Sequence, residues 1–131
     1  MQPLQEGATI EEMRVTPDKY LPYRYAGASG DFNPIHIDRE MATQANFPGI
    51  ILHGLYGMAL VARAVLGCAG DDPRRLRRLS VDFRAVAVPE HEIAVTGSIR
   101  EMRDGVATVD AVARQRGKRI IRSAEAELDV S

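Results

Sequence analysis

The segment that most constrains the fold is an apolar run from Leu55 to Leu66, inside HGLYGMALVARAVLGCAG. Every position of this run is apolar or glycine except Arg63, whereas a helix on a protein surface shows one polar face. At ~1.5 Å per residue, a helix over Gly54–Gly67 is a rod about 20 Å long. We therefore predict a helix that begins near Gly54 and is enclosed by the rest of the chain on nearly all sides.

The second half of the chain supplies the predicted cover. From Leu79 to Ala87 the odd positions are apolar and alternate with mostly polar residues, and the same period of two recurs in 93–99 and 124–130. Asp104-Gly105 is a strong hairpin signal, and Gly117-Lys118 is a weaker one. We expect four long antiparallel strands in series, wrapped around the helix in an α+β arrangement.

A single sheet cannot cover a helix on every side. The remaining cover must come from the N-terminal segments or from a second copy of the chain, so we predict a dimer. With 131 residues and 45% hydrophobic composition, residues 1–131 are expected to form a single domain with a sizeable core.

The N-terminal part predicts shorter elements. Residues 8–15 are typical of a short, half-polar strand, and Thr16-Pro17-Asp18 predicts a helix start that runs to about Ala26. Pro22 falls inside that helix and predicts a kink or two short pieces. Further on, Asp38 is a good N-cap for a short helix through Ala45.

The candidate chemistry lies in the segment from Tyr25 to Gly54. Asp31 and His36 are five residues apart, a spacing that a regular helix or strand would aim in different directions. Gly30 and Pro34 favour a tight loop between them, since glycine accepts positive φ and proline fixes its own φ. In such a loop the carboxylate and the imidazole would converge on one small molecule, and water is the obvious candidate.

Composition excludes several classes of function. A net charge of −1 and a pI near 6.3 give no reason to expect nucleic acid, and no wholly apolar run reaches the ~20 residues that span a bilayer. The start, MQPLQEGATIEEM, lacks the pattern of a secretory signal, so we expect a cytoplasmic protein. Cys68 is the only cysteine, which excludes an internal disulfide and cysteine-based zinc clusters, and we expect it to pack in the core.

The run YAGASGDFNPIHID, followed by IILHG, resembles the signature of the MaoC-like family of (R)-specific enoyl-CoA hydratases and 3-hydroxyacyl-thioester dehydratases. The resemblance extends over nearly the whole chain, from the strand near Gly7 to the four closing strands. It implies a hotdog fold, in which an antiparallel sheet wraps a long central helix and two such units pair edge to edge. It also implies acyl-CoA or acyl carrier protein thioesters as substrates, and no cofactor.

The resemblance implies that Asp31 and His36 hold a catalytic water, which adds to C3 of a trans-2-enoyl thioester or leaves in the reverse reaction. The backbone N–H of Gly54 would bind the thioester oxygen. That assignment agrees with the free N–H groups and positive partial charge of a helix N-terminus.

Supporting roles are expected for three further residues. Asn33 would brace the loop or orient Asp31, Gly30 would form the turn, and His53 would help the start of the helix rather than take part in the chemistry. His91 is expected to be a solvated turn residue, and pocket depth is expected to depend on residues such as Phe47, Leu55 and Met58.

Two further ligand questions arise from charged residues. The one basic cluster that the sequence singles out is either a solvated strand end or a site for coenzyme A phosphates or an acidic carrier protein; its members are Arg74, Arg75, Arg77 and Arg78. Asp31, His36, Asp38 and His53 match no compact metal motif, so we predict no metal.

Two other functions stay open at this point. One is a thioesterase on the same fold, which would release free thiol. The other is an acyl-binding or partner subunit of a heterodimeric dehydratase, although the presence of both Asp31 and His36 favours an active subunit. The sequence also departs from the family pattern: some relatives carry a hydroxyl in the central helix, where this chain offers Met58, Ala59 and Leu60.

Overall fold

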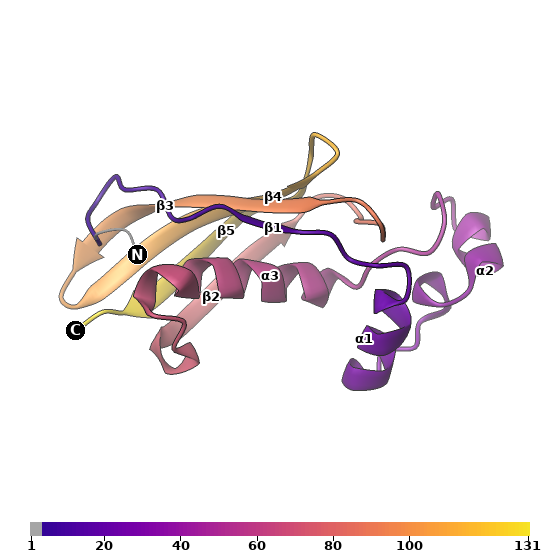
Figure 1. The fold of residues 1–131 in the computed structure, drawn as a ribbon, viewed down its shortest axis with the longest axis horizontal. Helices are drawn as coiled ribbons and strands as arrows, with labels where there is room; N and C mark the ends of the chain where they lie inside the picture. The colour runs from indigo at the N-terminus through magenta and orange to yellow at the C-terminus, as the bar shows by residue number, and fades with distance from the viewer. Residues whose placement is uncertain (1–3) are drawn as a thin grey trace.

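The structure, a computed structural model, describes residues 4–131 (Figure 1). A five-stranded antiparallel sheet covers one long helix, α3, and the short helices α1 and α2 lie beyond one end of it. The helices and 3-10 turns are α1 (Leu21–Ser29), η1 (Pro34–His36), α2 (Arg39–Gln44), α3 (Gly54–Leu66), η2 (Gly67–Ala69) and η3 (Pro73–Arg75). The strands are β1 (Met13–Val15), β2 (Leu76–Phe83), β3 (Ile93–Arg103), β4 (Val106–Gln115) and β5 (Lys118–Asp129).

The central helix begins at Gly54, as the sequence predicts. Its buried face includes Leu60, Val61 and Val65, which join the core beneath the strands. The prediction of enclosure on nearly all sides is wrong for one chain, because Leu55 is 61% exposed and Ala59 is exposed one turn later. The sheet covers one face of α3, and the apolar residues on the opposite face, Leu55 and Ala59, are exposed to solvent in the single chain.

The sheet has the strand order β1-β3-β4-β5-β2. The hairpins at Asp104-Gly105 and Gly117-Lys118 are confirmed, and both turns use positive φ angles. The expected series of four neighbouring strands is wrong in one respect, since β2 pairs with β5 instead of β3. Core residues alternate along β4 in the expected period of two, and they are Ala107, Val109, Ala111 and Ala113.

The N-terminal predictions need two corrections. Of the strand expected over 8–15, only Met13–Val15 forms a strand, with an isolated bridge between Thr9 and Ser98. The first helix runs from Leu21 to Ser29, and Pro22 lies in its first turn. Proline causes no break there because the first N–H groups of a helix have no partner within it.

The segment after β2 is a loop that forms a wall above the start of α3. The predicted strand to Ala87 ends at Phe83, because the chain then turns across α3, where the Ala87 carbonyl accepts a hydrogen bond of 2.8 Å from the N–H of Leu52. Buried Gln115 holds the same loop by bonding both the N–H and the carbonyl of Val88. His91 is exposed in this loop, as expected.

Cys68 is buried, as expected, and its Sγ lies 3.0 Å from the carbonyl oxygen of Val65, to which it donates. Burial raises the pKa of this thiol. Across residues 4–131, no helix has both the length and the apolar character needed to cross a membrane.

Candidate active site

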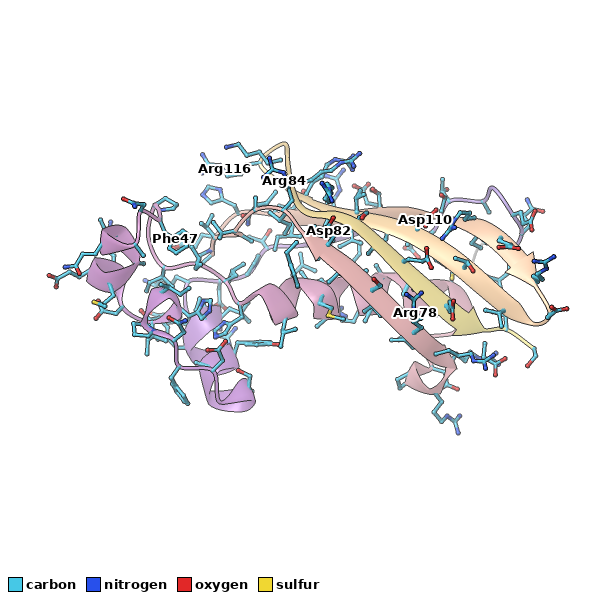
Figure 2. The ribbon with its side chains drawn as sticks, turned by 180° about the vertical axis from the view of Figure 1, so that it is seen from behind. Phe47, Arg78, Asp82, Arg84, Asp110 and Arg116 are labelled. Carbon is cyan, nitrogen blue, oxygen red and sulfur yellow. The ribbon has the colours of Figure 1, made fainter. Side chains whose placement is uncertain are left out.

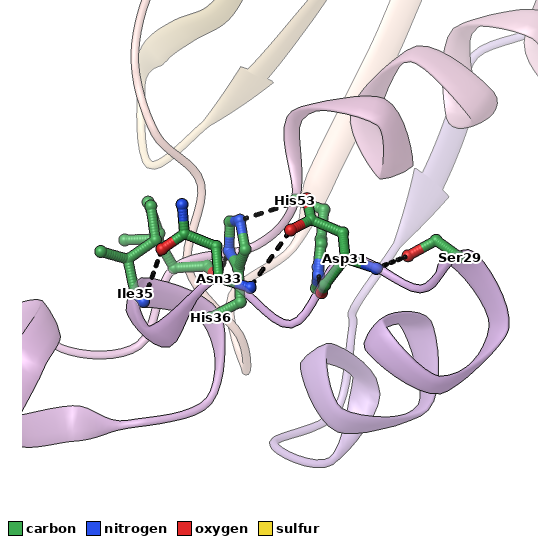
Figure 3. Close-up of polar contacts among 7 residues, drawn as sticks. Ser29, Asp31, Asn33, Ile35, His36 and His53 are labelled. Carbon is green, nitrogen blue, oxygen red and sulfur yellow. Dashed lines mark hydrogen bonds and ion pairs between the residues drawn. The ribbon is translucent and has the colours of Figure 1, made fainter.

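The loop that carries Asp31 is built from local hydrogen bonds (Figure 3). Helix α1 ends at Gly30, whose φ of 78° lies in the left-handed region and whose N–H reaches the Ala26 carbonyl at 2.8 Å. The N–H of Asp31 then donates to Ser29 Oγ, and the N–H of Asn33 donates to Asp31 Oδ1 at 3.2 Å. These bonds fix the carboxylate, so Asn33 both continues the turn and orients Asp31.

His36 ends the following 3-10 turn and faces Asp31 from the other side. Its Nε2 lies 3.9 Å from Asp31 Oδ2, so the bent loop brings together the two groups that sequence spacing alone would separate. His36 is 7% exposed, and its Nδ1 lies 2.8 Å from the carbonyl oxygen of Ile51. A carbonyl accepts only, so Nδ1 carries a proton, and in the neutral form of the ring Nε2 presents a lone pair toward the carboxylate.

Two acceptors at this separation suit a water molecule between them. A water that donates one hydrogen bond to each acceptor spans roughly 4–4.5 Å between them at ordinary bond lengths. The 3.9 Å between His36 Nε2 and Asp31 Oδ2 is too long for a direct hydrogen bond and close to this span. The side chain of Asp31 is 54% exposed, so water reaches the site from solvent.

His53 supports both groups from beneath. Its Nε2 lies 3.0 Å from the backbone oxygen of Asp31, and its ring stacks on His36 with centroids 3.8 Å apart. Tyr25 packs against its other side with centroids 4.7 Å apart. His53 makes no side-chain bond to the N-terminus of α3, so its contacts support the Asp31 loop instead of the helix start that the sequence suggested.

The other ring nitrogen of His53 is orphaned. Nδ1 is buried and has no hydrogen-bond partner within residues 4–131. Because Nε2 donates to Asp31, Nδ1 is an unprotonated acceptor in the neutral ring, and leaving it unpaired costs about 1–3 kcal/mol.

A cavity of about 450 Å³ is lined by His36 and His53, while Asp31 lies outside its wall, 3.9 Å from His36 Nε2. Gly54 lines it at the N-terminus of α3, where the first N–H groups of a helix have no intrahelical acceptor. A Cβ on Gly54 would lie 3.4 Å from the ring of Phe83 at the end of β2. The rest of the lining is mainly apolar and includes Ile35, Phe47, Leu52, Tyr56, Ile93 and Ile121.

The sequence analysis missed part of this wall. Phe47 lines the cavity as expected, whereas Leu55 and Met58 do not. The missed residues, Phe83 to Ala87 and Ile120 to Ile121, come from the end of β2, the loop after it and the neighbouring strand β5. No local pattern marks them, because only the pairing of β2 with β5 brings them over the start of α3.

Three potential metal ligands do converge here. One atom from each of Asp31, His36 and His53 lies within 4.8 Å of the others, although Asp38 is not part of the group. Nδ1 of His36 donates a hydrogen bond to the Ile51 carbonyl, and Nε2 of His53 donates one to the Asp31 carbonyl. These bonds occupy one nitrogen of each ring and leave His36 Nε2 and His53 Nδ1 without a direct hydrogen bond within residues 4–131, and the absence of a metal stays a prediction.

The predicted basic cluster is remote from this pair. Arg78 lies toward the end of β2 opposite to Phe47 and Arg84 (Figure 2). Three of the four arginines of this cluster have partners of their own, since Arg74 bonds Asp72 at 3.0 Å, Arg75 bonds the Asp129 carbonyl and Arg78 bonds Glu125.

Several solved structures have the same fold. The chain aligns with a structure named MaoC-like dehydratase at a TM-score of 0.92, with 28% identity, covering 98% of this chain and 41% of that one. It also aligns with the (R)-hydratase from A. caviae involved in PHA biosynthesis at a TM-score of 0.81, with 21% identity and full coverage of both chains. The predicted hotdog fold is therefore confirmed.

Curated relatives point the same way. The chain is 36% identical to enoyl-CoA hydratase 2, peroxisomal, of Arabidopsis thaliana over 88 residues, and 34% identical to the fatty acid synthase beta subunit TOXC of Cochliobolus carbonum over 100 residues. The matches include 66% and 74% of this chain, but only 28% and 5% of the relatives' lengths. The profile of the family described as MaoC like domain matches residues 2–118, and the chain therefore belongs to the MaoC-like family.

Proposed function

We propose that this chain catalyses the hydration of trans-2-enoyl thioesters to (3R)-hydroxyacyl thioesters and the reverse dehydration. The observation that carries the proposal is the 3.9 Å approach of Asp31 Oδ2 and His36 Nε2 beside an apolar cavity whose wall includes Gly54. The MaoC-like family membership and relatives named enoyl-CoA hydratase 2 and fatty acid synthase beta subunit support it.

In the hydration direction, the water held between Asp31 and His36 attacks C3 of the substrate. One of the two groups accepts the proton that the water loses, and the pair passes one proton on to C2 as the C2=C3 bond becomes single, so the protein neither gains nor loses a proton overall. The neutral His36 with its free Nε2 and the carboxylate of Asp31 are both suited to accept. Because both proton steps use the Asp31–His36 pair, whose nearest side-chain atoms lie 3.9 Å apart, we expect the hydroxyl and the hydrogen to add to the same face.

The negative charge that develops in this step falls on the thioester oxygen. An unpaired N–H at the N-terminus of α3 offers a fixed donor and a positive partial charge for it. Gly54 has no side chain, so a planar thioester can approach its N–H between the first turn of α3 and the ring of Phe83. We assign the (R) configuration to C3 of the hydroxyacyl product because the segment around Asp31 resembles the signature of the (R)-specific hydratases.

We further propose that residues 1–131 act as one hotdog domain in a homodimer, with a heterodimer of related hotdog subunits as the alternative. Two apolar features of the single chain support this: the open stripe of α3 at Leu55 and Ala59, and the exposed Phe83 on edge strand β2. Light scattering on a purified sample measures the assembly. The cytoplasmic location stays a prediction of the sequence.

The decisive experiment is the addition of crotonyl-CoA to the purified protein, with EDTA present, followed through loss of the enoyl absorbance. We expect turnover that yields the (3R)-hydroxy product on chiral analysis. Release of free thiol instead would identify a thioesterase, and an inactive protein across a panel of short and long enoyl thioesters would contradict the proposal. That panel, presented on coenzyme A and on acyl carrier protein, also identifies the chain length and the carrier.

A further inference from the structure

A second recess adjoins the apolar cavity and is strongly basic. The cavity ends at Arg84 and Ala85, and these two residues also line the neighbouring recess. The other lining residues of that recess are Lys118, Arg119 and Arg122, so we call Arg84, Lys118, Arg119 and Arg122 the basic recess. Figure 2 shows Arg84 and the hairpin residue Arg116 at the same end of the sheet, on the side toward Phe47.

The pairing of β2 with β5 explains why the recess continues from the cavity. Phe83 lies opposite Ile121 in the sheet, and the next residue, Arg84, donates its N–H to the Ile120 carbonyl at 2.9 Å. Lys118 is three positions before Ile121 on β5, which corresponds to about 10 Å of strand. A ligand that passes Phe83 on leaving the cavity therefore meets the basic side chains at once.

The basic recess differs from the rest of the sheet in its charge balance. Several strand arginines outside the recess have acidic partners, as in the pairs of Arg100 with Asp110 at 3.0 Å and of Arg78 with Glu125 at 3.2 Å, whereas Arg77 and Arg114 have none within residues 4–131. In the recess only Arg122 contacts an acid, Asp82.

The other three cations of the recess are uncompensated. Arg84, Lys118 and Arg119 are exposed, and no carboxylate of residues 4–131 lies within ion-pair distance of them. Arg119 also lies directly opposite Arg114 in the β4–β5 register. Like charges directly opposite each other destabilise a sheet. A bound anion would reduce the repulsion between Arg114 and Arg119.

We propose that the basic recess binds the phosphate groups of the coenzyme A nucleotide while the acyl chain occupies the apolar cavity. The inference rests on the proposed acyl-thioester chemistry. A thioester oxygen at Gly54 directs the pantetheine arm past Phe83, and guanidinium groups at Arg84 and Arg119 match phosphate oxygens in bidentate geometry. The phosphate site is then at this end of the sheet, and not at the cluster that begins with Arg74.

The test compares two thioesters and two double variants. Crotonyl-CoA carries the nucleotide, and crotonyl-pantetheine lacks it. We expect Arg84→Gln with Arg119→Gln to lower kcat/KM for crotonyl-CoA about tenfold or more, mainly through KM, since hydrogen bonds between charged groups are lost. The loss for crotonyl-pantetheine should be much smaller, and Arg74→Gln with Arg77→Gln should retain the wild-type kcat/KM for crotonyl-CoA.

Direct binding separates this proposal from the proposed reaction. Calorimetric titration with coenzyme A itself needs no turnover, and we expect the recess variant to bind at least about tenfold more weakly than the wild type. Equal affinity in the two proteins, or equal loss on both thioesters, overturns the assignment. Activity with enoyl thioesters of an acyl carrier protein alone, without binding of coenzyme A, overturns it as well.

Discussion

Replacement of Asp31 by asparagine tests the acid–base pair with the smallest change of shape. The amide oxygen of Asn can still accept from the N–H of Asn33, as Asp31 Oδ1 does at 3.2 Å. What changes is the second oxygen, 3.9 Å from His36 Nε2, which becomes an NH₂ group that accepts no proton.

The two effects of Asp31→Asn differ in size. The side chain is 54% exposed and its local bonds survive, so the free energy of unfolding should change by less than about 0.5 kcal/mol. Loss of a positioned acid–base group typically lowers the rate by about 10²-fold to 10⁴-fold. That loss corresponds to about 2.7–5.4 kcal/mol of activation free energy.

The assay is hydration of crotonyl-CoA under saturating substrate, with urea denaturation of the same samples. Asp38→Asn is the matched control, because Asp38 is a nearby carboxylate that caps α2 by accepting from the N–H groups of Glu40 and Met41. Asparagine caps a helix about as well as aspartate, so this control should keep its rate and stability. A near wild-type kcat for Asp31→Asn would remove the carboxylate from the mechanism.

Four further outcomes follow from the same geometry. His36→Ala should abolish turnover and lower the unfolding free energy by about 1–3 kcal/mol in urea denaturation, since the Ile51 carbonyl loses its buried donor. His53→Phe keeps an aromatic ring in the stack but loses the bond to the loop carbonyl, so kcat should fall while KM changes little in steady-state assays. Gly54→Ala should fold, because the added methyl group meets only an ordinary contact, yet lose roughly tenfold or more in kcat/KM by crowding the N–H. Cys68 should react with Ellman's reagent only in denaturant, because burial raises the pKa of its thiol and native protein holds little thiolate at neutral pH.

The sequence predicted those elements whose signal is local. The apolar run that starts α3, the alternation along β3 to β5 and the Asp38 cap each belong to one segment, and the structure confirms them. Pro22 was misread as an interior break because helix boundaries depend on capping geometry that a pattern locates only to within a few residues.

The site was predictable in part for the same reason. Asp31 and His36 share one short loop with strong turn signals, and their approach follows from it. The Ile51 carbonyl that selects the His36 tautomer is fifteen residues away in the sequence, and Arg84, which lines the cavity, lies in the loop after β2. Contacts between residues this far apart in the sequence depend on which strands pair with each other, and the period of apolar residues within one strand does not determine that pairing.

The aromatic ring at the end of β2 links the reaction cavity to the outer edge of the sheet. Phe83 is 49% exposed, lies over Gly54, and belongs to a strand that has β5 on one side and no other strand of residues 4–131 on the other. Whatever pairs with that free edge also fixes how far the ring leans over the first turn of α3. If the chain turns over enoyl thioesters as a dimer, as proposed above, we expect the rate per molecule to fall on dilution, because separation of the paired chains would loosen the contact of Phe83 with the first turn of α3.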